Sequence, residues 1–304
     1  MVRSMLRSAS LVLALSVGIT AAAHAEEYLK SYSVAGRADV HVNAQWGIVH
    51  VTSSAGNRVE FDVTYDKKEW ASSLAIDSKQ QGNVVSLTAL VDEHSWWGWS
   101  TFSDRRVTIE VRMPKNADLQ LQTTNGGINV SSVNGNVSIH TTNGEINAEQ
   151  LAGTIEIAST NGKVILDSLS GAVRVHTTNG AIRADHLVCK CTLETSNGQV
   201  EVAGRFESLD VTSDNGGIVA RAESGSRMSS DWRVRTTNAR VDLSLPTDLK
   251  ANLNASTTNG RITSDLPITV QGEVGREELR GTLNGGGPEM TIRTTNGAIR
   301  VSGI

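Results

Sequence analysis

Asn-Gly recurs at a fixed interval through the middle of this sequence, and its period limits the possible folds more than any other feature. The motif reads TTNGGINV at Thr123–Val130 and TTNGEINA at Thr141–Ala148, and close variants follow. Six asparagines succeed one another at intervals of 18 residues: Asn125, Asn143, Asn161, Asn179, Asn197 and Asn215. Looser copies follow at Asn238, Asn259 and Asn296. Such a period is typical of a repeat protein, in which each unit buries its apolar face only against its neighbours.

Apolar residues keep a constant position relative to each asparagine. Counting from Asn125 they fall at +3, +5, +8, +12 and +14, and the next three units repeat these positions. Steps of two residues are typical of strands with one buried face, and the longer steps indicate two turns in each unit. Each unit therefore predicts two short strands. The residues expected inside the first two units are Ile128, Val130, Val133, Val137, Ile139, Ile146, Ala148, Leu151, Ile155 and Ile157.

Two all-β topologies fit this pattern: a parallel, β-helix-like solenoid with about 18 residues per coil, and an antiparallel meander of hairpins. Asn-Gly is a strong hairpin signal, which favours the meander. Residue identity, however, repeats every 18 residues and not every nine. Identical residues gain most where coils stack directly on one another, about 4.8 Å apart. We therefore predict the parallel β-solenoid.

The N-terminus has the pattern of a secretory signal peptide. Arg3 and Arg7 precede the apolar stretch Leu11–Ala23, and Ala23-His24-Ala25 fits a cleavage site before Glu26. This combination predicts export, to the periplasm or to the cell surface. No later stretch is apolar over a length that spans a bilayer, so we expect no transmembrane segment in the mature chain.

The repeat pattern divides the chain after the signal peptide into three segments. The segment before the repeats alternates like strands, and we expect it to cap the first coil, because an open coil end is an aggregation-prone edge. The glycine-rich stretch Gly281–Gly287 predicts a loop before the last strand. The predicted segments are the signal peptide over 1–25, an N-terminal β segment over 26–120, regular repeats over 121–216, and irregular repeats of the same solenoid with longer loops over 217–304.

The motifs at both ends of the repeats resemble those of a known family. A strand that ends in proline, Arg106–Pro114, leads into LQLQTTNGGINV, and the chain closes with GTLNGGGPEMTIRTTNGAIRV. Over roughly residues 30–304 the chain resembles the bacterial β-strand-repeat family named "putative adhesin", a domain of unknown function found in exported proteins. The resemblance implies an exported, solenoid-like β protein with a role in adhesion. It implies no catalytic residues, and we predict no cofactor.

The asparagine column predicts a structural ladder. Asn before Gly suits a turn with a left-handed backbone, and stacked amides satisfy one another's donors and acceptors. We expect this ladder to point inward. Calcium-binding β-rolls share the 18-residue coil, but their turns carry aspartate, so the neutral asparagines argue against a calcium roll.

Three acidic residues share another column, six positions after their asparagines: Glu149, Asp167 and Asp185. A solenoid would stack these carboxylates near one another just after a strand. Neighbouring carboxylates can bind a divalent cation weakly, or act as a general acid and a general base. They also occur as plain solvent-exposed residues at the edge of a sheet, without a function. The sequence leaves these alternatives open.

The run from His94 to Phe102 contains Trp96, Trp97 and Trp99 between two predicted strands. Three tryptophans in a loop are costly to expose unless they pack against the chain itself or against a partner. They are therefore candidates for a binding site, and the alternative is a cap on the coil end.

These features favour a non-catalytic binding or scaffold protein of the cell envelope, with an envelope glycan or protein as partner. The net charge of −4 argues against nucleic acid as the main target. The alternative is an enzyme that acts on polysaccharide, a lyase or a hydrolase, because β-helices also carry such enzymes. That alternative needs clustered titratable side chains, and only the acidic column offers them.

Overall fold

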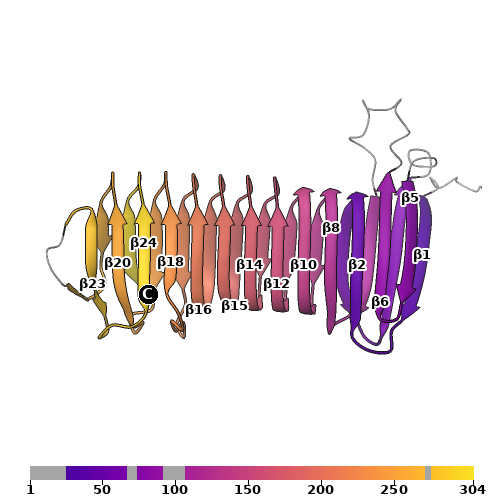
Figure 1. The fold of residues 1–304 in the computed structure, drawn as a ribbon, viewed down its shortest axis with the longest axis horizontal. Coiled ribbons are helices and arrows are strands. Elements are labelled where there is room, and N and C mark those ends of the chain that lie inside the picture. The colour runs from indigo at the N-terminus through magenta and orange to yellow at the C-terminus, as the bar shows by residue number, and fades with distance from the viewer. Residues whose placement is uncertain (1–24, 67–73, 92–106, 271–274) are drawn as a thin grey trace, which may run out of the picture.

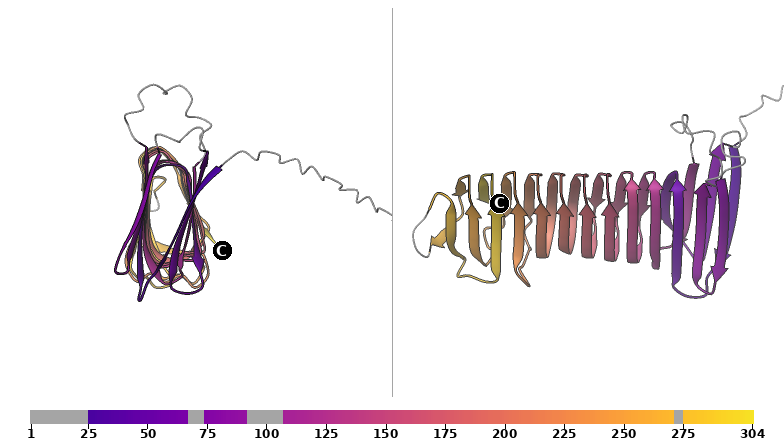
Figure 2. Two further views of the ribbon diagram at one scale, coloured as in Figure 1. Left: turned by 90° about the vertical axis from the view of Figure 1, so that its right-hand side faces the viewer. Right: turned by 45° about the horizontal axis from the view of Figure 1, so that its top comes forward.

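The computed structural model describes residues 25–66, 74–91, 107–270 and 275–304 of the 304-residue chain. Within these residues every regular element is a β-strand, and the strands form one elongated stack (Figure 1). Seen from its end, the stack is a flattened tube of two facing layers (Figure 2). We call the layer that contains β8 and β10 the front sheet and the opposite layer the back sheet. The prediction of an all-β fold with parallel strands is confirmed.

The middle of the stack is built from coils that each contribute strands to both layers. Val137 pairs with Ile155, and Ile155 with Val173, in parallel register in the front sheet. Ile146 pairs with Val164, and Val164 with Ile182, in the back sheet. The strands are β8 (Ala117–Asn125), β9 (Ile128–Ser131), β10 (Asn134–Asn143), β11 (Ile146–Glu149), β12 (Ala152–Ser159), β13 (Val164–Asp167), β14 (Ser170–Thr177), β15 (Ile182–Thr195) and β16 (Val200–Ser213).

Alternation along these strands builds the core. Strand β13 alternates buried and half-buried residues, and β14 alternates buried and exposed ones along its second half. All the inward positions predicted from the repeat, from Ile128 to Leu193, are buried. The core is therefore a thin layer of aliphatic side chains between the two sheets, as expected from the scarcity of aromatic residues.

The N-terminal end of the stack changes from parallel to antiparallel pairing. Strand β2 pairs in parallel with β8 and β6, and β3 with β9 and β7. Beyond them, β5 is antiparallel to β6, β4 to β7, and β1 to β4. The bounds are β1 (Ala25–Ser33), β2 (Ala38–Trp46), β3 (Ile48–Ser54), β4 (Arg58–Asp66), β5 (Leu74–Gln81), β6 (Val84–Val91) and β7 (Val107–Pro114).

The C-terminal end does not follow chain order. Strand β24 lies between β18 and β20 (Figure 1). In the opposite layer, β25 lies between β19 and β21. The last coil of the chain is thus inserted between two earlier ones. The strands are β17 (Ile218–Ala222), β18 (Trp232–Thr236), β19 (Val241–Leu245), β20 (Ala251–Thr257), β21 (Ile262–Ser264), β22 (Ile268–Val270), β23 (Glu278–Leu283), β24 (Glu289–Thr294) and β25 (Ile299–Gly303).

The predicted loop over Gly281–Gly287 is wrong in its first part. Gly281 lies within β23, which pairs antiparallel with both β20 and β22. A Cβ atom at Gly281 would collide with Ile268, so the glycine permits close approach of β22. The turn starts only at Asn284, which together with Gly285 and Gly286 has positive φ.

Candidate functional site

The asparagine column forms a continuous ladder of side-chain hydrogen bonds. Asn161 Nδ2 donates to Asn143 Oδ1 at 2.7 Å, and Asn179 Nδ2 donates to Asn161 Oδ1 at 2.8 Å. Both Asn143 and Asn161 are exposed, so the prediction that the ladder points inward is wrong. The ladder follows the outer edge of the stack, where the chain crosses from the front sheet to the back sheet.

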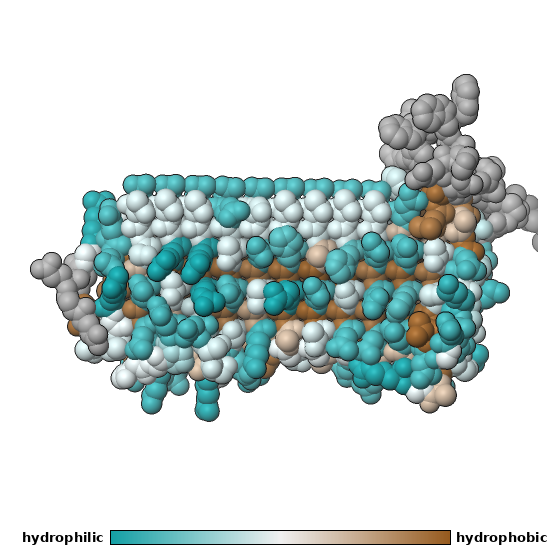
Figure 3. All heavy atoms as spheres, in the orientation of Figure 1, coloured by the Kyte–Doolittle hydropathy of each residue, from teal (hydrophilic) through white to brown (hydrophobic). Residues whose placement is uncertain are grey.

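All nine asparagines of the motif belong to this ladder. In spatial order they are Asn125, Asn143, Asn161, Asn179, Asn197, Asn215, Asn238, Asn296 and Asn259, joined by amide bonds of 2.7–2.9 Å. Figure 3 shows the result as a hydrophilic row along the upper edge of the molecule. The edge stays regular through the C-terminal coils because the inserted coil carries the same motif.

A second ladder lies directly beneath the first and is buried. Thr195 Oγ1 accepts a hydrogen bond from the Gly198 backbone N–H at 3.1 Å and donates to the Gly180 carbonyl at 3.0 Å. The hydroxyl thus closes its own turn and joins it to the preceding coil. The same bonding to the preceding coil occurs at Thr177 and Ser213. Sequence reasoning missed this ladder, although a Thr or Ser opens every copy of the motif.

The hydroxyl ladder is incomplete at its N-terminal end. Thr123 Oγ1 and Thr141 Oγ1 are buried and have no hydrogen-bond partner among the described residues. In these coils the Gly126 N–H donates to the Asn143 carbonyl, whereas from the next coil onwards the Asn161 N–H donates to the Thr142 carbonyl. The change in turn geometry leaves these two hydroxyls unused.

A glycine follows eight of the nine ladder asparagines, with Ala239 after Asn238 as the exception, and close stacking of the turns explains this preference. A Cβ atom at Gly180 would collide with the carbonyl group of Gly162, and one at Gly198 with that of Gly180. Asn-Gly therefore acts here as a corner of stacked coils rather than as a hairpin turn.

The ladder ends at an aromatic residue on its N-terminal side. Trp46 takes the place of an asparagine in the register with Asn125, and the Gly47 N–H donates to the Asn125 carbonyl at 3.1 Å. Trp46 is partly buried against the core. The tryptophans singled out from the sequence, Trp96, Trp97 and Trp99, lie outside the described residues.

The acidic residues lie side by side on the back of the stack, as the repeat predicted. Glu149 pairs in register with Asp167, and Asp167 with Asp185. Two of them contact basic side chains: Asp167 Oδ1 lies 2.7 Å from His186 Nδ1, and Asp185 Oδ2 lies 3.1 Å from Arg183 Nε. The hydrogen bond with Asp167 raises the pKa of the exposed His186 above its usual value. Within the described parts of the chain, no three His, Cys, Asp or Glu side chains converge as metal ligands would.

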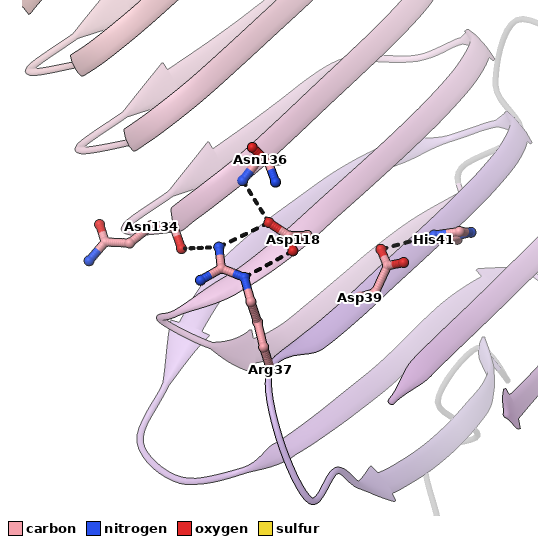
Figure 4. A network of polar contacts seen from close by, with 6 residues as sticks. All are labelled: Arg37, Asp39, His41, Asp118, Asn134 and Asn136. Atoms are coloured by element: carbon pink, nitrogen blue, oxygen red, sulfur yellow. Dashed lines mark hydrogen bonds and ion pairs between the residues drawn. The ribbon is translucent and has the colours of Figure 1, made fainter. Parts of the chain in front are cut away.

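A polar network joins the N-terminal strands to the first regular coils (Figure 4). Arg37, just before β2, binds both carboxylate oxygens of Asp118 at 2.9 Å, and its Nη2 also donates to the Asn134 carbonyl at 3.2 Å. Asp118 Oδ1 accepts a further bond from the Asn136 N–H at 2.7 Å. These bonds, with that from Arg37 the largest contribution, hold the pKa of Asp118 below its usual value.

An open hollow on the front sheet adjoins this network. Its lining includes His41, Asn43 and Lys79 from the N-terminal strands and Gln122 and His140 from the first coils. His41 Nε2 lies 2.9 Å from Asp39 Oδ1 (Figure 4). The lining also includes apolar residues, among them the exposed Val84, so the hollow presents both hydrogen-bonding groups and apolar surface to a partner.

Several solved structures match this chain over nearly its whole length, at low identity and with low TM-scores. One is a putative adhesin from Bacteroides fragilis, with 11% identity, 92% of this chain and 97% of that chain covered, and a TM-score of 0.39. A putative lipid binding protein from Parabacteroides distasonis has 12% identity, coverage of 90% and 96%, and a TM-score of 0.39. A putative cell adhesion protein from Clostridium sporogenes has 12% identity, coverage of 92% and 100%, and a TM-score of 0.30.

Comparison with curated protein sequences gives no match. Within the described residues, no helix has the length and hydropathy needed to cross a membrane. The family model described as Toastrack DUF4097 matches residues 43–302 and confirms the family resemblance expected from the repeat motifs. The chain belongs to the Toastrack DUF4097 family.

Proposed function

We propose that this protein is a non-catalytic, exported binding or scaffold protein of the cell envelope, which presents its asparagine edge to an envelope glycan or protein. The observation that carries the proposal is the ladder of nine asparagines in one straight file, eight of them exposed and Asn125 half-buried. Within this class of function, we favour an adhesin-like role.

The ladder leaves hydrogen-bonding capacity for a partner. An asparagine amide has two N–H donors and a carbonyl oxygen with two lone pairs. Asn161 uses one N–H and one lone pair within the ladder, which leaves one donor and one acceptor. The file repeats this pair at each coil, about 4.8 Å apart. An extended chain with regularly spaced hydroxyl, amide or carbonyl groups can bind along such a file.

The ladder is also rigid, which favours binding. Each amide is held by its neighbours above and below, and the hydroxyl ladder fixes the backbone beneath it. Ordering side chains at an interface costs about 0.5–1.5 kcal/mol for each one that becomes immobilised. Amides that are already ordered avoid most of this cost.

Export rests on the N-terminal pattern in the sequence, since residues 1–24 lie outside the described residues. Strand β1 begins at Ala25. Cleavage before Glu26 would therefore leave the strand almost whole. The antiparallel strands β1, β4 and β5 would then cap the N-terminal end of the stack, and β22 and β23 the other end.

The tryptophans remain a proposed second contact. Trp96, Trp97 and Trp99 lie in the segment between β6 and β7, the strands next to the coil in which Trp46 ends the ladder. Changing all three to serine should remove much of the binding to envelope material while the melting temperature stays the same. A large fall in melting temperature would assign them to packing instead.

Binding of envelope fractions to edge variants tests the proposal. The variant with Asn161, Asn179 and Asn197 changed to alanine should lose binding to an envelope glycan or protein that the unmodified chain retains. The matched control is Asn147→Ala, because Asn147 donates to Asn129 at 3.0 Å on the back sheet, away from the edge. Equal binding by the edge variant and the control would contradict the proposal.

A further inference from the structure

The out-of-order insertion of the last coil brings two arginines side by side. Three residues before each ladder asparagine, a side chain points outward from the front sheet. At the C-terminal coils this row reads Thr212, Arg235, Arg293 and Ser256, on the neighbouring strands β16, β18, β24 and β20. Arg235 and Arg293 are direct register partners. Adjacent strands lie about 4.8 Å apart, so the two side chains start close together.

Neither arginine is neutralised by the rest of the described chain. No described residue forms an ion pair or a hydrogen bond with the guanidinium group of Arg235 or Arg293, whereas that of the neighbouring Arg233 lies 3.8 Å from Asp210. Both side chains are exposed. Like charges directly opposite on adjacent strands destabilise a sheet. Figure 3 shows strongly hydrophilic side chains over this part of the front sheet.

The two arginines belong to a hollow that is rich in hydroxyl groups. Its lining comprises both arginines, one carboxylate and several Ser and Thr residues. Ser213, Thr236, Thr257 and Thr294 are buried, and their hydroxyls donate to backbone carbonyls of the hydroxyl ladder. The remaining hydroxyl side chains of the lining are those of Thr212, Thr237, Ser256, Thr258 and Thr295. The carboxylate is that of Asp214, which forms no ion pair with either arginine. The lining therefore has an excess of positive charge and hydroxyl donors at the rim.

We propose that Arg235 and Arg293 form an oxyanion site that binds a phosphate group, either free or carried by a sugar. Guanidinium groups bind phosphate oxygens through paired N–H donors, and such charged hydrogen bonds are among the strongest in proteins. Two adjacent guanidinium groups bind one phosphate between them, and threonine hydroxyls at the rim donate to its remaining oxygens. The bound anion also removes the repulsion between the two cations. This site adjoins the asparagine edge, since its lining includes Thr237, Thr258 and Thr295, but it contains none of the ladder asparagines, and phosphate itself tests it.

Titration with inorganic phosphate, followed by NMR of the arginine Nε–Hε groups, tests the site. Chloride at equal ionic strength serves as the reference, since it screens charge without paired acceptors. We expect phosphate to shift the signals of Arg235 and Arg293. Arg293→Gln and Arg235→Gln should each weaken binding by about tenfold or more, because a charged hydrogen bond is lost. Without phosphate, each variant should melt at the same or a higher temperature than the unmodified chain.

Arg174→Gln is the matched control, because Arg174 lies on the same sheet in register with Glu156 and should not contribute. A second titration with glucose 1-phosphate, against glucose, identifies the source of the phosphate. Binding of both phosphates supports a site for phosphate on sugars, and binding of inorganic phosphate alone supports a site for the free anion. The proposal is overturned if neither probe shifts the two arginine signals beyond the chloride reference, or if Arg174→Gln weakens binding as much as Arg293→Gln does.

Discussion

The side-chain amide of Asn296 donates to Asn238 Oδ1 at 2.9 Å across 58 residues of sequence. Asn259 then donates to Asn296 at 2.8 Å, so the last coil of the chain bridges two earlier ones. One straight ladder results from segments that are out of order in the sequence. The edge of the molecule, rather than the path of the chain, is the regular feature of this fold.

Breaking the middle of the ladder should reduce stability. Asn161→Leu removes the hydrogen bonds to Asn143 and Asn179 while keeping a side chain of similar size. Because the site is exposed and water replaces part of each bond, we expect the free energy of unfolding to fall by only about 1–2 kcal/mol. Urea denaturation measures the change. An unchanged free energy would show that the amide bonds contribute nothing to folding.

The buried hydroxyls should differ in importance along the stack. Thr195→Val leaves the Gly198 N–H without its acceptor inside the corner, at an expected cost of about 1–3 kcal/mol. Thr123→Val replaces a buried hydroxyl that has no partner and should be neutral or slightly stabilising. Chemical denaturation of the two variants compares them directly. Equal costs would contradict the assignment of the hydroxyl ladder.

The contact of Arg37 with Asp118 should give an acid-dependent contribution to stability. Because the pKa of Asp118 in the folded state lies below its ordinary value of 3.8, the contribution is complete above that value. It is lost as the pH falls through the lower folded-state pKa. Arg37→Gln should therefore destabilise the protein at neutral pH, by about 1 kcal/mol given the exposure of the pair, and the difference should shrink in acid. A difference that stays constant from neutral to acid pH would exclude this linkage.

Asp167→Asn tests the acidic column in two ways. His186 should titrate at a lower pH in the variant, because the hydrogen bond that raises its pKa is weakened. The raised pKa means that this contact stabilises the fold below the ordinary histidine value of 6.5 and is lost as the pH rises through the folded-state pKa. NMR titration of the His186 ring measures the shift, and an unchanged titration would contradict the contact.

The same variant also separates the two functional classes. A binding protein should keep its affinity for envelope material when Asp167 is changed, since the acidic column lies on the back of the stack. Loss of a measurable glycan-cleaving activity in Asp167→Asn would instead favour the polysaccharide-acting enzyme.

The sequence period predicts the core well but not the side on which the ladder lies. Val137 and Ile139 alternate correctly into the interior, and the same alternation continues to Thr141 and would place Asn143 inside. The strand reaches the corner there, and alternation ends, so that the threonine is buried and the asparagine is exposed. The alternation of apolar residues predicts which side chains are buried within a strand. It does not predict which way a side chain points at a corner, where the strand ends.

The spatial order of the last coils could not be predicted from the sequence either. The copies at Asn238, Asn259 and Asn296 share the residues TTN and present the same columns, so the Asn296 coil can stack on Asn238 as well as on Asn259. The residues of the motif therefore do not determine which coil lies next to which. In the structure, β20 pairs with β24 of the last coil on one side and antiparallel with β23 on the other, so the position beyond β20 is occupied by β23.

Side-chain amide NMR signals test most directly whether the asparagine edge binds a partner. Fragments of envelope glycan added to isotope-labelled protein should shift the amide signals of ladder residues such as Asn161 and Asn179. The signal of Asn147, on the back sheet, should stay in place. Shifts confined to Asn147 and its surroundings, with the ladder signals unchanged under saturating binding, would contradict the account.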